Sequence, residues 1–266
     1  MGTYAYSLKR YFKISLTEWK SIMLVAFAVG FILSYNNWGG VTFDFATGLT
    51  NLVLDTVGAF LMITVFVAAN KAVGIFYGIW SDFERYNLGL LVGVFISFLS
   101  FGFIPIWTTG YFRYKAIPNL RLGKFRATLV KPWEEGLVTV GTIFACLLVT
   151  ILLGVLFNLT GIDFFMRMTW ISLLIALYAM IPLPLVQTTN VYQVYMSRFE
   201  SLEGNLPGYD LFWASPSYYF GILGMVLAFI FMNFFFPANT ITIGVSFVLF
   251  LIGMWVWTKL RDIHRL

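Results

Sequence analysis

Residues 88–110 read LGLLVGVFISFLSFGFIPIWTTG, and the path of this stretch decides how the whole chain is arranged. The stretch is long and apolar enough to cross a membrane, which takes about 20 mostly apolar residues. It also contains residues that disturb a helix, namely Gly89, Gly93, Gly102, Pro105 and Gly110. Irregular backbone at membrane depth is tolerated only where protein covers it. We therefore expect a re-entrant or β-rich insert here instead of a lipid-facing helix.

Six further runs come near the length and apolarity of membrane helices. They lie at about 21–35, 50–70, 137–157, 169–186, 217–236 and 241–258. Of the 266 residues, 60% are hydrophobic and 11% are charged, whereas a soluble domain carries about 25% charged residues. The sequence therefore predicts an all-α polytopic membrane protein whose natural surroundings are a lipid bilayer. We expect a single membrane domain over 1–266, ending in a helical hairpin over 217–258.

The distribution of Lys and Arg predicts the orientation, because these residues favour the cytoplasmic side. If all seven runs crossed, the loop 111–136 would place six basic residues outside. If 88–110 enters and returns on one side, 16 of the 17 Lys and Arg residues lie inside and only Arg167 lies outside. We therefore predict six transmembrane helices, with the insert between the second and third, and both termini cytoplasmic.

Other features of the composition narrow the possible functions. The net charge is +5, but the chain has no basic arm or nucleic-acid-binding module, so we expect no nucleic-acid partner. The single cysteine, Cys146, lies in an apolar run and is interpreted as a small packing residue. The polar stretch 198–215 predicts a flexible cytoplasmic loop.

Four fragments occur in an order that points to a family. Residues 14–20 read ISLTEWK, 70–85 read NKAVGIFYGIWSDFER, 123–126 read GKFR, and 181–188 read IPLPLVQT. In this order they resemble the site-2 protease family of intramembrane zinc metalloproteases, especially its archaeal-type branch. The resemblance covers about residues 14–195 and implies a zinc site made by an H-E-x-x-H motif on one helix and an aspartate from a Pro-rich turn.

The residues that this chemistry requires are replaced. Phe66 and Asn70 stand where the resemblance implies the two histidines, Val67 stands at the glutamate that activates water, and Gln187 stands at the aspartate. A catalytic zinc ion takes three protein ligands from His, Cys and carboxylates, and the only histidine of the chain is His264. We refer to Phe66, Val67, Asn70 and Gln187 as the degenerate positions. They predict a catalytically inactive relative, a pseudoprotease, without metal or other cofactor.

The polar residues near the degenerate positions, and the Pro-rich turn, are the candidate binding residues. They are Asn70, Pro182, Pro184, Gln187, Thr188 and Asn190, with Thr189 between the last two. The polar side chains either hold an unwound peptide or partner helix, or form hydrogen bonds with each other that hold the helices together. The two prolines break the predicted fifth helix, which either frees backbone for an extended substrate strand or makes a packed kink.

Asp55 is a further candidate, because a carboxylate within a membrane span is costly and often functional. It lies early in the second predicted span, with no basic residue one helical turn away, and it either reaches interfacial water or handles protons or ions. The function expected first is therefore binding or scaffolding of membrane proteins or peptides. A structural subunit of a membrane complex and a transporter or channel remain alternatives, and an active protease is the least expected.

Overall fold

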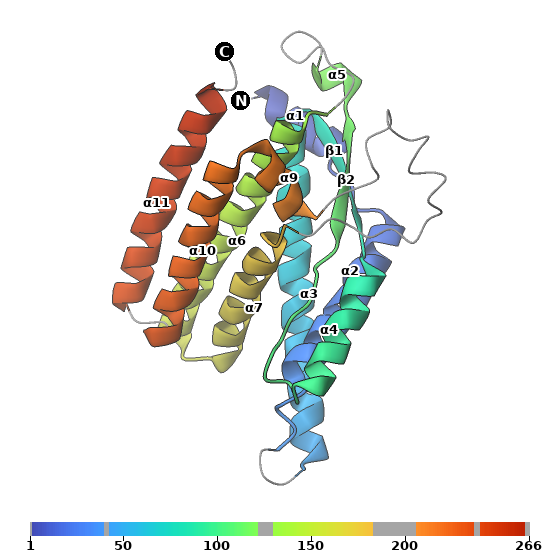
Figure 1. Ribbon diagram of the computed structural model, residues 1–266, viewed down its shortest axis with the longest axis vertical. Coiled ribbons are helices and arrows are strands. Elements are labelled where there is room, and N and C mark those ends of the chain that lie inside the picture. The colour runs from blue at the N-terminus through green and yellow to red at the C-terminus, as the bar shows by residue number, and fades with distance from the viewer. Residues whose placement is uncertain (1, 40–42, 122–129, 183–205, 237–239, 264–266) are drawn as a thin grey trace.

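The computed structural model describes residues 2–39, 43–121, 130–182, 206–236 and 240–263 (Figure 1). These residues are mostly helical, with one two-stranded sheet. The longer helices are α2 (Leu16–Ser34), α3 (Phe45–Phe76), α6 (Pro132–Thr160), α7 (Asp163–Ala179), α10 (Pro216–Phe235) and α11 (Thr240–Ile263). The shorter elements are α1 (Gly2–Tyr11), β1 (Ile79–Glu84), α4 (Asn87–Leu99), β2 (Tyr111–Ala116), α5 (Pro118–Arg121) and α9 (Pro207–Ala214).

Within the described residues, α2, α3, α6 and α10 are long and apolar enough to cross a membrane. The longest, α3, has 32 residues and so measures about 48 Å, which exceeds the roughly 30 Å of a bilayer's hydrocarbon core. The chain is therefore an integral membrane protein built mainly from helices. Of the other two long helices, α7 has 17 residues, and α11 contains a shorter apolar stretch, Thr242–Val256.

Local sequence signals explain where the first two long helices begin. At α2, the Ser15 hydroxyl accepts from the Glu18 amide and the Glu18 carboxylate accepts from the Ser15 amide, which forms a capping box. At α3, the Asp44 carboxylate accepts from the amides of Ala46 and Thr47. These two bonds and a third from the Thr47 hydroxyl lower the pKa of Asp44.

The long helices form one bundle with short connections between antiparallel neighbours. α2 leads into α3, α6 into α7, and α10 into α11, and Figure 1 shows each pair side by side. Gly161 takes a left-handed φ of 66° at the turn between α6 and α7, a conformation that glycine adopts without steric cost. α1 and the far end of α11 lie at the same end of the bundle as β1 and β2 (Figure 1).

The insert follows a path that leaves and returns at this same end. β1 pairs antiparallel with β2, in a register that joins Ile79 to Ala116 and Glu84 to Tyr111. Residues 85–110 therefore begin and end side by side, as a re-entrant insert requires. Their outward arm is the helix α4, and residues 103–110, which begin with a bend and contain no helix or strand, lead back to β2. We call residues 103–110 the return arm; the β structure is confined to the base of the insert.

Glycines on α4 allow the return arm to lie directly against the helix. A Cβ atom at Gly93 would overlap the carbonyl oxygen of Ile106, and one at Gly89 would overlap the side chain of Thr108. At the turn between the two arms, Gly102 has a φ of 78° and lies against Asn36, just beyond α2. The insert therefore reaches as deep as the far end of α2.

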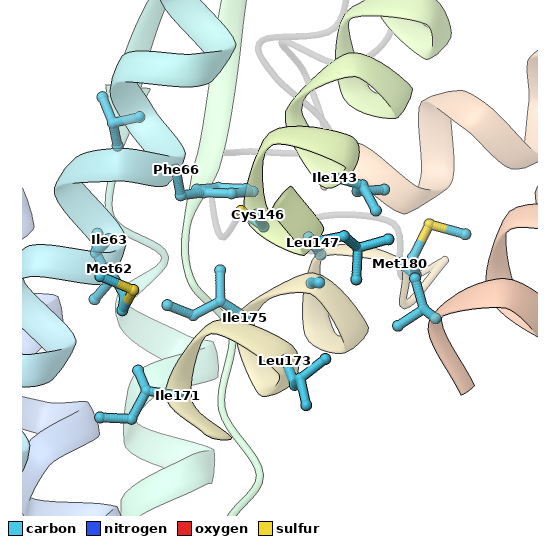
Figure 2. Close-up of a cluster of buried hydrophobic side chains, with 14 of the residues drawn as sticks. Met62, Ile63, Phe66, Ile143, Cys146, Leu147, Ile171, Leu173, Ile175 and Met180 are labelled. Atoms are coloured by element: carbon cyan, nitrogen blue, oxygen red, sulfur yellow. The ribbon is translucent and has the colours of Figure 1, made fainter. Parts of the chain in front are cut away.

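The main core lies among α3, α6 and α7 (Figure 2). Met62, Ile63 and Phe66 of α3 face residues from the other two helices in this cluster. The other labelled residues of the cluster are Ile143, Cys146 and Leu147 on α6, Ile171, Leu173 and Ile175 on α7, and Met180 just beyond the end of α7. Cys146 is 2% exposed within this cluster, which confirms its interpretation as a packing residue.

Two expectations about the second half of the chain are wrong. The helix expected over 169–186 ends earlier, since α7 stops at Ala179 and the exposed Pro182 lies beyond its end. Pro182 therefore follows a helix terminus and does not kink a helix. The flexible loop expected over 198–215 contains the helix α9, which packs against α6 where Leu211 and Ala214 meet Gly136. The end of α7 and α9 also touch, because Gly208 lies against the carbonyl of Met180.

Candidate functional site

The first two degenerate positions are filled by apolar packing. Phe66 is 1% exposed and Val67 is fully buried, both on α3. The ring of Phe66 lies 5.5 Å from the ring of Phe112 on β2, measured between centroids. The face of α3 that the resemblance assigns to zinc ligands is therefore packed against the sheet at the base of the insert.

The third degenerate position, Asn70, links three elements. Its fully buried side chain donates from Nδ2 to the Tyr114 hydroxyl at 3.1 Å and to Thr142 Oγ1 at 3.2 Å. Thr142 in turn donates to the Val138 carbonyl within α6. Asn70 thus joins α3 to β2 and α6, which is the role of a polar residue that holds helices together. Its Oδ1 atom has no hydrogen-bond partner within the described residues.

Tyr114, which accepts the hydrogen bond from Asn70, also lies near two carboxylates. Burial raises the pKa of Tyr114, and the negative charges of Asp210 on α9 and Glu135 on α6 raise it further. The phenol therefore stays protonated at neutral pH and can bond as a neutral group. Asp210 is 4% exposed. Asp210 was not predicted as part of a site, because residues 198–215 were expected to form a flexible loop.

Next to Asn70, Lys71 forms a buried ion pair. Lys71 Nζ lies 2.7 Å from Glu18 Oε1 and donates to the Ser81 carbonyl at 2.6 Å. Glu18 Oε1 also accepts from the amide of Phe83 at 2.9 Å, while its other oxygen caps α2. This pair ties α2, α3 and β1 together. The S-x-x-E pattern at 15–18 indicates the capping role of Glu18. It gives no indication of Lys71 as the partner of Glu18, because Lys71 is 53 positions away.

Asp55 lies in a separate network nearer the other end of α3. Its carboxylate is 5% exposed and accepts from Arg167 Nη1 of α7 at 3.1 Å. The second guanidinium nitrogen of Arg167 donates to Asn51 at 2.8 Å, and Asn51 donates to the carbonyl of Asn37. The expectation that Asp55 reaches interfacial water is therefore wrong. Its partner comes from another helix, so a search within one turn of α3 could not find it.

The residues at the degenerate positions do not fit a zinc ion. Phe66 and Val67 offer no donor atom, and Asn70 offers only one neutral amide oxygen, whereas a catalytic zinc ion takes three protein ligands from His, Cys and carboxylates. Within the part of the chain that the structure describes, no three His, Cys, Asp or Glu side chains gather in a way that could hold a metal. Four candidate residues lie outside the described residues, namely Pro184, Gln187, Thr188 and Asn190.

The return arm passes beside α7 with part of its backbone unpaired. The buried ring of Trp107 lies 4.6 Å from the ring of Tyr178, measured between centroids, and the Tyr178 hydroxyl donates to the Pro105 carbonyl. Among the described residues, the amides of Trp107, Thr108 and Thr109 find no hydrogen-bond acceptor. An extended segment with free amides can accept a further strand. The glycines and Pro105 predicted irregular backbone in this stretch, but they did not indicate which amides lack an acceptor.

No family model, curated protein or solved structure matches the chain.

Proposed function

We propose that this chain is a non-catalytic relative of the site-2 proteases that binds an extended segment of a membrane protein or peptide along its return arm. The unpaired amides of Trp107, Thr108 and Thr109 are the observation that carries this proposal. Backbone donors without partners are costly at membrane depth. A bound strand would satisfy the amides on the edge where it adds, either those of Trp107 and Thr109 or that of Thr108, because successive amides of an extended segment point to opposite edges.

The contact between Glu18 and Lys71 supports the relationship to the family. Glu18 belongs to the fragment 14–20 and Lys71 to the fragment 70–85, and both fragments carry the resemblance. Their side chains meet in a buried ion pair. A pairing between two fragments is what a shared fold would preserve, whereas fragments that resemble a family by chance have no reason to meet.

The proposed binding surface is the exposed side of the return arm, whose opposite side is buried against the protein. Trp107 and Thr109 point into the protein and are buried, while Ile104 and Ile106 are exposed. This alternation is that of a half-buried strand, whose outer side chains face a partner. A bound segment would lie against the exposed side of residues 104–108, and its side chains would meet apolar surface.

The proposed topology has six crossings, made by α2, α3, α6, α7, α10 and α11, with the insert entering from the cytoplasmic side. Both termini are then cytoplasmic, and α1, β1, β2 and α5 lie at the same face. Arg167, the one basic residue outside, is compensated by its ion pair with Asp55. The exception to the charge distribution therefore places no uncompensated positive charge on the outer side.

The pairing of Asp55 also bears on the transporter alternative. That alternative rests on a carboxylate within a membrane span that can bind a proton or ion. Here the carboxylate bonds to Arg167, so a proton or ion would have to compete with the guanidinium for Asp55. A structural subunit of a membrane complex remains compatible with the proposed binding surface, since its neighbours would be bound through the same return arm.

Photo-crosslinking tests the proposed function. A photoreactive amino acid at Ile104 or Thr108, and at Gln187 in the Pro-rich turn, should crosslink to one recurrent membrane protein or peptide in native membranes. Phe231 is a suitable control position, because it is exposed on α10, away from the return arm. If Ile104 and Thr108 crosslink only within the chain, the return arm is covered internally and the binding proposal is rejected.

A further inference from the structure

A polar cleft of about 700 Å³ opens at the end of the bundle that carries the sheet. It lies between the start of α2 and the junction of β1 with α4, and it contains no degenerate position. Its lining includes three acidic residues, two basic residues and one tyrosine, namely Glu18, Asp82, Glu84, Lys20, Arg85 and Tyr111.

The three acidic residues of the cleft already have partners. Glu18 bonds to Lys71, and Glu84 Oε2 accepts from the Tyr111 hydroxyl at 2.7 Å and from Arg113 Nη2 at 2.9 Å. Asp82 accepts from Trp80 Nε1 at 2.6 Å and lies 3.9 Å from Lys71 Nζ, the ammonium that also pairs with Glu18. Glu18 and Glu84 are each matched by one cation from outside the cleft lining, so neither contributes an uncompensated negative charge.

The two basic residues of the cleft have no partner within the described residues. Lys20 and Arg85 are exposed, and neither forms an ion pair or hydrogen bond within the described residues. They come from opposite walls, Lys20 from the second turn of α2 and Arg85 from the residue after β1 ends. An ammonium and a guanidinium that share one polar cleft favour a phosphate group between them.

Exposed apolar residues follow both cations along α2 and α4, in the direction away from the cleft. On α2, Met23, Leu24 and Phe27 follow Lys20 by three, four and seven positions, which places them on its face of the helix, and they are 62%, 42% and 59% exposed. On α4, Leu88 and Leu91 follow Arg85 and are also exposed. A cationic cleft above exposed apolar helices matches a phospholipid, with a phosphate in the cleft and acyl chains along α2 and α4.

We propose that this cleft binds the headgroup of an anionic phospholipid through Lys20 and Arg85. The acyl chains lie along the exposed apolar faces of α2 and α4. Because the cleft sits at the base of the insert, a bound lipid fills the space between α2 and α4 where the insert enters the membrane. This binding involves neither the return arm nor the degenerate positions, so it stands or falls separately from the proposed function.

Native mass spectrometry of the full chain tests this proposal, with phosphatidylglycerol and phosphatidylcholine offered in equal amounts. The wild-type protein should retain phosphatidylglycerol in preference. The double variant Lys20→Gln, Arg85→Gln should bind it about 25-fold more weakly, at about fivefold for each basic residue. Lys115→Gln removes an exposed lysine outside the cleft lining and should bind like wild type.

Thermal unfolding and competition with inorganic phosphate complete the test. In detergent without added lipid, thermal unfolding of the double variant should match wild type, because neither side chain has a partner within the described residues. If the double variant does not fold, the single variants Lys20→Gln and Arg85→Gln should each bind phosphatidylglycerol about fivefold more weakly than wild type. Inorganic phosphate should compete poorly, because it lacks acyl chains; competition as strong as that of the lipid would mean a free-phosphate site. Equal retention of both lipids, or unchanged binding by the double variant, overturns the proposal.

Discussion

The carboxylate of Glu18 and the ammonium of Lys71 lie 2.7 Å apart, and both side chains are 4% exposed. Removing one member of such a pair leaves a buried charge without a partner, which costs about 3–5 kcal/mol. We expect Lys71→Met to lower the unfolding temperature in detergent strongly. Lys13→Met, at an exposed lysine, should leave it unchanged.

A double-mutant cycle measures the coupling within this pair. Glu18→Gln with Lys71→Met should be less destabilised than the sum of the two single changes, with a coupling of about 0.5–3 kcal/mol. Tryptophan fluorescence during thermal unfolding provides the measurement. Strict additivity would mean that Glu18 and Lys71 do not interact in the folded protein.

The contact between α4 and the return arm gives a second prediction, which compares two helical glycines. Gly93→Ala places a methyl group against the Ile106 carbonyl, and such overpacking costs about 1–3 kcal/mol. Gly221→Ala on α10 meets nothing within 4 Å and should be neutral or stabilise by up to about 1 kcal/mol. Equal unfolding temperatures for the two variants would show that the return arm does not pack against α4.

The ion pair between α3 and α7 should depend on both terminal guanidinium nitrogens of Arg167. Arg167 bonds to Asp55 and to Asn51 with different nitrogens, which a single ammonium reproduces poorly. Arg167→Gln should cost about 1–3 kcal/mol by leaving the Asp55 carboxylate unpaired, and Arg167→Lys should cost less. Arg85→Gln, at an arginine without a partner in the described residues, serves as the matched control when both variants are measured in detergent without added lipid. No difference between Arg167→Gln and Arg85→Gln would contradict the pairing.

Metal content gives the fourth prediction. Elemental analysis of purified protein should find far less than one zinc per chain, because the degenerate positions supply no ligand set. Addition of a chelator should leave the unfolding temperature unchanged. A tightly held zinc that disappears in Asn70→Ala would reverse this interpretation.

The path of the insert could be predicted from sequence, because charge and glycine both constrain it. The six basic residues of 111–136 and the glycines on α4 independently indicated a segment that enters and returns. The structure adds why the glycines are needed, since the return arm lies on Gly89 and Gly93. Which arm is helical could not be predicted, because short apolar runs fit a helix and a strand equally well.

The ion pairs and α9 could not be predicted, for two physical reasons. Glu18 and Lys71, like Asp55 and Arg167, come from different helices, and hydrophobic periodicity reports the faces of one helix without its neighbours. α9 is short and contains Pro207 and Gly208, which read as turn residues. Proline fits the first turn of a helix, and packing against α6 then stabilises eight residues that are too few to form a helix alone.

The path of residues 85–110 with respect to the membrane is the central claim, and cysteine accessibility in intact cells tests it most directly. On a Cys146→Ala background, single cysteines at Lys115 and Lys124 should resist a membrane-impermeant reagent until the cells are permeabilised. A cysteine at Phe43, between α2 and α3 at the opposite end of the bundle, should react in intact cells. Labelling of Lys115→Cys or Lys124→Cys in intact cells would mean that residues 88–110 cross the membrane, and the re-entrant insert would be wrong.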